Sequence, residues 1–155
     1  MRRSAMIVAI AALLATPAAA SASSGMVTYT GRTSSGHHVT FQVAHNRMYN
    51  LRAGVRVSCV PIQGPDRTPV GGTDFFGYKG YVPIQPHVRF KFLDKTALYW
   101  NPVTKTHDIW MKRRGNAIKA RLRVQFSFLM PKLDPGVFTI YSCLGGSTFT
   151  ARPQR

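Results

Sequence analysis

The stretch IKARLRVQFSF, residues 118–128, decides the fold class of this chain. Apolar side chains alternate strictly with polar and basic ones over its whole length. Such a period of two is typical of a β-strand with one face buried and the other in water. We expect Ile118, Ala120, Leu122, Val124, Phe126 and Phe128 to face inward, and Lys119, Arg121, Arg123, Gln125 and Ser127 to face outward.

Shorter stretches with the same alternation occur at residues 39–43, 53–59 and 88–92. Beyond the first 20 residues, no segment has a helical period. Glycine and proline interrupt every window there that is long enough for a helix. Many short strands separated by turns predict an all-β antiparallel fold, either a sandwich or a barrel. We expect a β-sandwich of roughly seven to nine strands.

Turn-forming residues divide the chain at hairpin-like intervals, and one region breaks this pattern. Turns are expected at residues 34–36, 94–95, 101–102, 114–116, 131–136 and 145–146. Residues 61–86 are rich in proline and glycine and also contain Phe75, Phe76, Tyr78 and Tyr81. Two interpretations stay open here: a long functional loop with an aromatic platform, or aromatic side chains that fold back over an open end of the core.

The first residues have the layout of a secretory signal peptide. Arg2 and Arg3 precede an apolar run over residues 5–15, and small residues follow. We expect a leader over residues 1–20, with cleavage after Ala20 or Ala22, and a single secreted domain over residues 21–155. The apolar run is too short for a retained membrane helix, so no membrane span is expected after leader removal.

The two cysteines, Cys59 and Cys143, fit this exported context. Both fall on alternating stretches, so we expect a disulfide that joins two strands near the core. Two buried free thiols are the alternative. Neither C-x-x-C nor H-x-x-x-H spacing accompanies the cysteines, and we therefore expect no metal site and no cofactor.

The chain is strongly basic: 21 lysines and arginines stand against five acidic residues, all of them aspartates, for a formal net charge of +16. Such a charge attracts polyanions. The alternative is that it only keeps the protein soluble. Outward residues two apart on a strand lie about 7 Å from each other, so the long strand predicts a basic row. The candidate binding residues are Lys119, Arg121 and Arg123 of that row, Arg113 and Arg114 at the preceding turn, and Arg89 and Lys91 as a second stripe. The alternative is that outward strand positions are polar and basic simply to protect sheet edges.

Residues 29–43, which include the turn Gly31-Arg-Thr-Ser-Ser-Gly36, and then Val57-Ser-Cys59 resemble the opening of an uncharacterised domain family. That family occurs in secreted proteins of high-GC Gram-positive bacteria. Residues 136–143 and 149–151 resemble the end of the same domain. The resemblance implies a disulfide-linked β-sandwich, and it carries no functional residues over to this chain.

No motif in the chain identifies an enzyme. A G-x-S-x-G elbow is absent, and the scattered aspartates show no pair spaced for glycoside hydrolysis. The histidines offer general acid–base groups, but no spacing singles out two of them: His37, His38, His45, His87 and His107. We therefore expect a non-catalytic, monomeric, secreted or envelope-associated domain that binds anionic cell-wall polymers or an acidic partner. The alternative is a small secreted hydrolase such as a nuclease. Because no nucleic-acid motif is present, no sequence-specific binding is expected.

Overall fold

The computed structural model describes residues 25–98 and 101–154, and its described residues form eight strands and no helix. All strand pairs are antiparallel. This confirms the predicted all-β antiparallel class and strand number. The strands are β1 Val27–Thr33, β2 His38–Ala44, β3 Arg47–Gln63, β4 Val70–Pro83, β5 His87–Leu98, β6 Asn101–Arg114, β7 Ala117–Pro131 and β8 Phe138–Pro153.

The strands form one continuous sheet in the order β4-β3-β2-β1-β8-β7-β6-β5. Strand β3 pairs first with β2 and then, from Val57 onward, with β8. Strand β8 pairs in turn with β3 and then with β1. The β1–β2 hairpin is therefore inserted between β3 and β8, and these four strands make a closed ring of pairings. Because the pairing is continuous, a division into two separate sheets is not confirmed.

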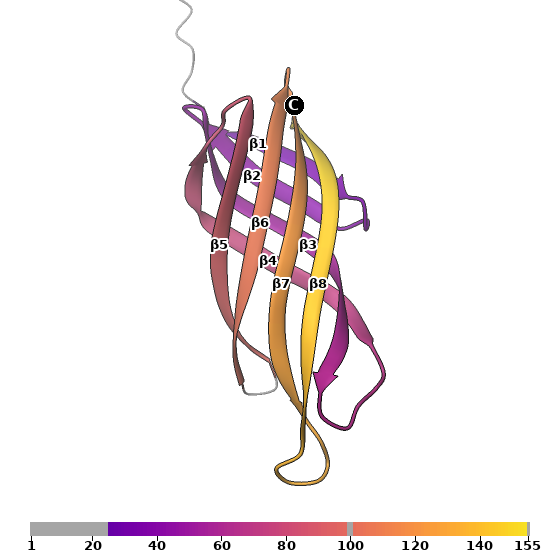
Figure 1. Cartoon of the computed structure of the whole chain (residues 1–155). Helices are drawn as coiled ribbons and strands as arrows, with labels where there is room; N and C mark the ends of the chain where they lie inside the picture. Colours follow the sequence, from indigo (N-terminus) through magenta and orange to yellow (C-terminus); the bar gives the residue numbers. More distant parts are fainter. Residues whose placement is uncertain (1–24, 99–100, 155) are drawn as a thin grey trace, which may run out of the picture.

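The sheet folds over on itself around an apolar core. In Figure 1, β5 to β8 run in front of β1 to β4, which cross behind them at an angle. The alternating residues of β7 behave as predicted, since Leu122 and Val124 are buried and Lys119, Arg121 and Arg123 are exposed. Apolar side chains from both layers fill the space between them, among them Phe41, Leu51, Val55, Ile109 and Leu122.

The predicted turn at residues 145–146 is wrong, because β8 continues through both glycines. A Cβ atom on Gly145 would lie 2.6 Å from Val57 Cγ1 and 2.7 Å from the carbonyl oxygen of Arg56. Glycine is thus required by the close approach of β3, not by a reversal of the chain.

Two other turn predictions are wrong. Strand β5 runs unbroken through residues 94–95, and Asn101 and Pro102 begin β6 rather than end a strand. Alternation simply continues past Asp94, since Thr96 and Leu98 stay half-buried. The predicted strand end at Tyr99 and Trp100 lies outside the described residues. The turns at residues 34–36, 114–116 and 131–136 are confirmed.

Most of residues 61–86 is not a loop, since it contains β4. The loop interpretation is therefore wrong for this segment. Phe76 faces the core with 6% of its surface exposed, whereas its neighbour Phe75 is 70% exposed. Aromatic cover of the core is thus confirmed for Phe76 but not for Phe75. Because β4 is an end strand, it tolerates glycines that would weaken a central one.

Cys59 and Cys143 are register partners on β3 and β8 and form the predicted disulfide, with an S–S distance of 2.07 Å. Both are buried. The predicted covalent link between two strands near the core is confirmed.

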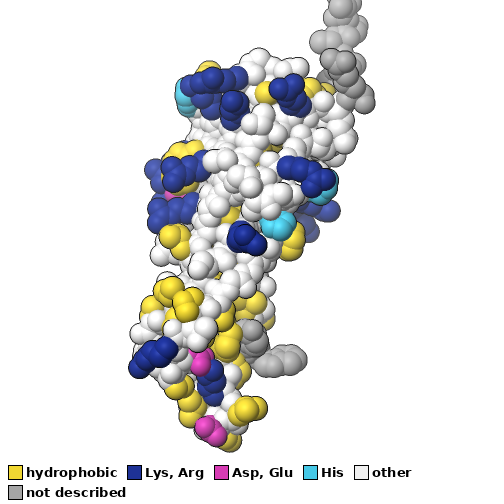
Figure 2. Space-filling view, turned by 90° about the vertical axis from the view of Figure 1, so that its right-hand side faces the viewer, with side chains coloured by type: hydrophobic (Ala, Val, Ile, Leu, Met, Phe, Trp, Pro, Cys, Tyr) yellow, Lys and Arg dark blue, Asp and Glu magenta, His cyan; other side chains and the backbone are white. Residues whose placement is uncertain are grey.

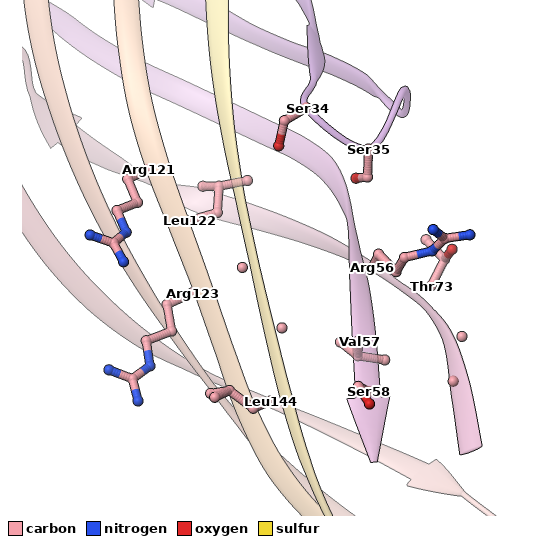
Figure 3. A pocket seen from close by; sticks show the side chains of 14 residues that line it. Ser34, Ser35, Arg56, Val57, Ser58, Thr73, Arg121, Leu122, Arg123 and Leu144 are labelled. Atoms are coloured by element: carbon pink, nitrogen blue, oxygen red, sulfur yellow. The ribbon is translucent and has the colours of Figure 1, made fainter. Parts of the chain in front are cut away.

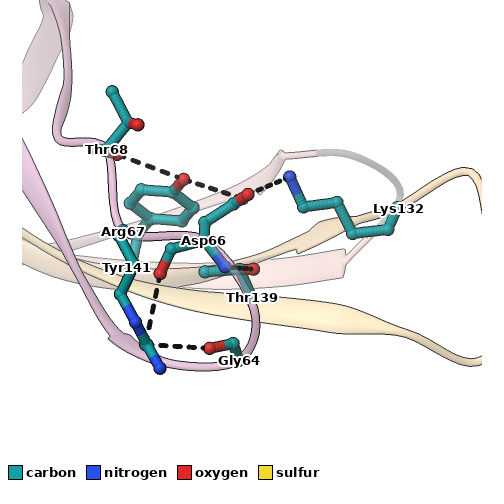
Figure 4. A network of polar contacts seen from close by, with 7 residues as sticks. All are labelled: Gly64, Asp66, Arg67, Thr68, Lys132, Thr139 and Tyr141. Carbon is teal, nitrogen blue, oxygen red and sulfur yellow. Dashed lines mark hydrogen bonds and ion pairs between the residues drawn. The ribbon is translucent and has the colours of Figure 1, made fainter.

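A polar network joins residues between β3 and β4 to Lys132, Thr139 and Tyr141 (Figure 4). The Asp66 carboxylate accepts a hydrogen bond of 2.9 Å from the Tyr141 hydroxyl and forms an ion pair with Lys132. The Asp66 backbone N–H donates to Thr139 Oγ1 over 3.4 Å. Hydrogen bonding to Lys132 holds the pKa of Asp66 below its ordinary value. These contacts tie the β3–β4 loop to the β7–β8 loop.

Candidate functional site

The register of β5, β6 and β7 places the predicted basic residues on one outer face. Arg89 and Lys91 of β5 are exposed, as are Lys119, Arg121 and Arg123 of β7. The two stripes are not neighbours, because β6 lies between them.

Strand β6 contributes residues to this face that the sequence did not single out. Asp108 lies opposite both Lys91 and Arg123, Trp110 lies opposite both Arg89 and Arg121, and Lys112 lies opposite Lys119. Strand alternation predicts that these β6 residues share a face, but only the register shows which cations they contact.

Asp108 partly neutralises the β5 stripe. Arg89 donates two hydrogen bonds to its carboxylate, Nε to Oδ1 at 3.1 Å and Nη2 to Oδ2 at 2.6 Å. Lys91 Nζ lies 3.8 Å from Oδ2. The hydrogen bonds from Arg89 hold the pKa of Asp108 below its ordinary value. The Arg89 guanidinium also stacks 4.5 Å from the centre of the Trp110 ring.

Arg113 and Arg114 do not simply continue the β7 row. Arg113 donates to the carbonyl oxygen of Gly115 over 3.3 Å and to Asn46 Oδ1 over 3.4 Å. Arg114 is exposed at the end of β6 opposite Ala117. Of the predicted set, Lys119, Arg121 and Arg123 are therefore the residues that form a regular row.

This row borders the outer face of β8, where small residues lie between two lines of cations. Lys119 is the register partner of Thr150, Arg121 of Thr148 and Arg123 of Gly146. On the other side of β8, Arg32 of β1 is also a register partner of Thr150, and Arg56 of β3 lies just before Val57, the partner of Gly145. We call this arrangement the β8 track: Gly146, Thr148 and Thr150, flanked by Lys119, Arg121, Arg123, Arg32 and Arg56.

Two open hollows follow the β8 track. The larger, of about 980 Å³, has Arg121 and Arg123 on one side of β8 and Arg56 on the other (Figure 3). Glycines of β4 and β8 and the hydroxyls of Ser34 and Ser35 also line it. The smaller, of about 520 Å³, lies between Arg32 and Lys119. Among the described residues, no acidic side chain lines either hollow. Figure 2 shows many lysine and arginine side chains over the upper part of the side that it faces.

The histidines are dispersed. His45 lies in a turn, His87 begins β5, and His107 is buried in the core. His37 and His38 line a separate hollow of about 680 Å³ together with Arg52. His37 Nε2 lies 3.2 Å from Thr73 Oγ1. Among the described residues, no histidine lines the hollows of the β8 track.

Within residues 25–98 and 101–154, no group of three His, Cys, Asp or Glu side chains is placed to hold a metal ion. Over the same ranges, no helix is long and apolar enough to cross a membrane. No protein-family model, curated protein or solved structure matches this chain.

Proposed function

We propose that this protein is a non-catalytic, exported domain that binds a linear polyanion along the β8 track. The observation that carries the proposal is the pair of cation lines on the two sides of β8, with small residues between them and no acidic residue in the adjoining hollows. Asp108 lies opposite Arg123 but accepts two hydrogen bonds from Arg89 of the β5 stripe, so it neutralises that stripe more than the β7 row, which favours β8 as the site.

The geometry suits an extended anion better than a small one. Lys119, Arg121 and Arg123 follow one another at steps of about 7 Å, so they span about 14 Å along the strand. Arginine offers paired N–H donors to phosphate or carboxylate oxygens. At Gly146, β8 has no side chain, so a ligand can approach its backbone. The track has polar small residues rather than exposed aromatic rings, which favours recognition of charge over stacking.

Anionic cell-wall polymer is the ligand class that we favour. An acidic protein partner is the other ligand class, because its carboxylates would contact the same lysine and arginine side chains. The expected leader and the disulfide support an exported, envelope-associated location. The resemblance to secreted domains of high-GC Gram-positive bacteria supports the same setting.

Retention on a cell-wall fraction tests this proposal. Wild type should be retained on walls that keep their anionic polymers and lost on walls from which these have been extracted. Replacing Lys119, Arg121 and Arg123 with serine should abolish the difference. A control of equal charge, Arg67, Lys79 and Lys95 to serine, should bind as wild type, because these exposed residues line neither hollow of the track. Equal retention of both triple variants would mean that the charge serves only solubility.

The alternative, a secreted hydrolase acting on nucleic acid, is favoured by one observation. His37, His38 and Arg52 line the same hollow, which offers two acid–base groups and a phosphate partner. Incubation of the refolded protein with RNA and DNA tests it. Cleavage that is lost in both His37→Ala and His38→Ala would replace the binding proposal with this one.

A further inference from the structure

A polar cluster is enclosed in the core, away from the β8 track. Asp74 of β4 contacts Lys105 and His107 of β6, with His107 Nε2 at 3.0 Å from Asp74 Oδ2 and Lys105 Nζ at Asp74 Oδ1. The side chains are only 2%, 11% and 1% exposed for Asp74, Lys105 and His107. The sequence did not single out this group, because Asp74 lies in the proline- and glycine-rich region and the strand order is needed to bring it to β6.

Aromatic rings surround the cluster. The rings of Phe92 and Phe76 lie 4.6 Å and 4.4 Å from the His107 ring, and Phe92 is stacked on it. Lys105 Nζ lies 5.2 Å from the centre of the Phe126 ring. Lysine and aspartate therefore meet among aromatic rings, with little of either side chain exposed to solvent.

Such a pair is a poor source of stability as an ion pair. The loss of hydration of two buried charges offsets most of their attraction, and an apolar pair of the same volume often serves as well. The two residues are also far apart in the strand order. Asp74 lies on β4, one end of the sheet, and Lys105 lies on β6, next to β5 at the other end. The contact thus joins two regions that the strand pairing leaves unconnected.

We propose that Lys105 and Asp74 form an intramolecular amide bond. The neutral Lys105 amine attacks Cγ of the protonated Asp74 carboxyl group, the Nζ–Cγ bond forms, and the Cγ–Oδ2 bond breaks. Oδ1 gives up the carboxyl proton and stays as the amide oxygen, and Oδ2 leaves as water with that proton and one amine proton. No oxidant, reductant or further reactant is needed.

The contacts of Asp74 with Lys105 and His107 provide a path for the proton transfers of this step. Burial by itself raises the pKa of Asp74, but hydrogen bonds from His107 and Lys105 outweigh it and hold this pKa below its ordinary value. Asp74 therefore rests as the carboxylate, in an ion pair with Lys105. Transfer of one proton from Lys105 to Asp74, across a contact that already exists, gives the neutral pair, and the apolar setting reduces the free-energy cost of that transfer.

His107 contacts the oxygen that leaves. Among the described residues its buried Nδ1 has no hydrogen-bond partner, so a ring proton is assigned to Nε2, which donates to Asp74 Oδ2. From this position the imidazole donates to Oδ2 as the Cγ–Oδ2 bond breaks and regains a proton from Nζ. His107 is thus assigned as a catalytic residue of the condensation.

Intact-mass spectrometry of the reduced, unfolded protein tests the proposal. Relative to the mass calculated from its sequence and its measured N-terminus, wild type should be lighter by one water. Lys105→Met and Asp74→Ala should have the full calculated mass, whether or not they fold well. The control Lys112→Met, an outward-facing lysine on the same strand, should keep the loss of water.

Peptide mapping locates the bond. Tandem mass spectrometry should find one branched peptide that joins residue 74 to residue 105. Asp94 is the register partner of Lys105 on β5, so a branch at Asp94 would contradict the assignment. A wild-type protein with its full mass and a linear Lys105 peptide would overturn the proposal. After cell-free synthesis, when both proteins start with their full mass, His107→Phe should lose water about 100-fold or more slowly than wild type, and an unchanged rate would remove His107 from the mechanism.

Discussion

Arg32 of β1 and Lys119 of β7 face each other across a single residue, since both are register partners of Thr150 on β8. Neighbouring strands lie about 4.8 Å apart, so the two backbones are separated by about 10 Å. A polyanion lying along β8 would therefore be contacted from both sides rather than from one row.

Replacement of Arg32 and Arg56 with serine tests this two-sided arrangement. If each contacts one phosphate of a duplex DNA probe, the slope of log K against log salt should fall by about two units. Binding should weaken equally for all DNA sequences, because phosphate contacts carry no sequence information. Fluorescence anisotropy at several salt concentrations measures both effects. An unchanged slope would confine binding to the β7 row.

Asp108→Asn should strengthen polyanion binding. The substitution removes the charge that holds Arg89 and Lys91, and both cations then become available on the same face as Arg121. The expected result is a higher affinity and a steeper salt dependence in the same anisotropy assay. Asp134→Asn, at an exposed loop position, is the matched control and should bind as wild type.

Stability should fall in acid because of Asp66 and Asp108. The pKa of each carboxyl group is held below its ordinary value of 3.8 in the folded protein, by Lys132 and by Arg89 respectively. A lowered pKa contributes stability that is present above the unfolded value and is lost as the pH falls through the folded value. The melting temperature should thus decrease as the pH is lowered below about 4. The decrease should be smaller in Asp66→Asn, and an identical profile in that variant would show that Asp66 contributes nothing.

Gly145→Ala should destabilise the fold, by about 1–3 kcal/mol, because the new methyl group would meet Val57 and the Arg56 backbone where β3 and β8 pair. Gly72→Ala is the control, since nothing lies within 4 Å of its Cβ position. Urea unfolding monitored by circular dichroism measures both. Equal stability of the two variants would contradict the close approach.

The alternation at residues 118–128 predicted both faces of β7 correctly, because a period of two depends only on which side chains prefer water. Strand β4 was missed because proline and glycine usually mark turns. Here the glycines lie on an end strand, which tolerates residues that would weaken a central strand. Local patterns also do not reveal strand order. The insertion of the β1–β2 hairpin between β3 and β8 brings Arg32 and Arg56 to the β8 track, and the closing of the sheet brings Asp74 to Lys105.

The central claim is that the β8 track binds polyanions through its cations. The most direct measurement is the salt dependence of binding to duplex DNA for wild type, the Lys119, Arg121 and Arg123 to serine variant, and the Arg67, Lys79 and Lys95 to serine control. We expect a slope that falls by up to about three units in the first variant and stays unchanged in the control. Equal losses in the two variants, which change the net charge equally, would contradict it.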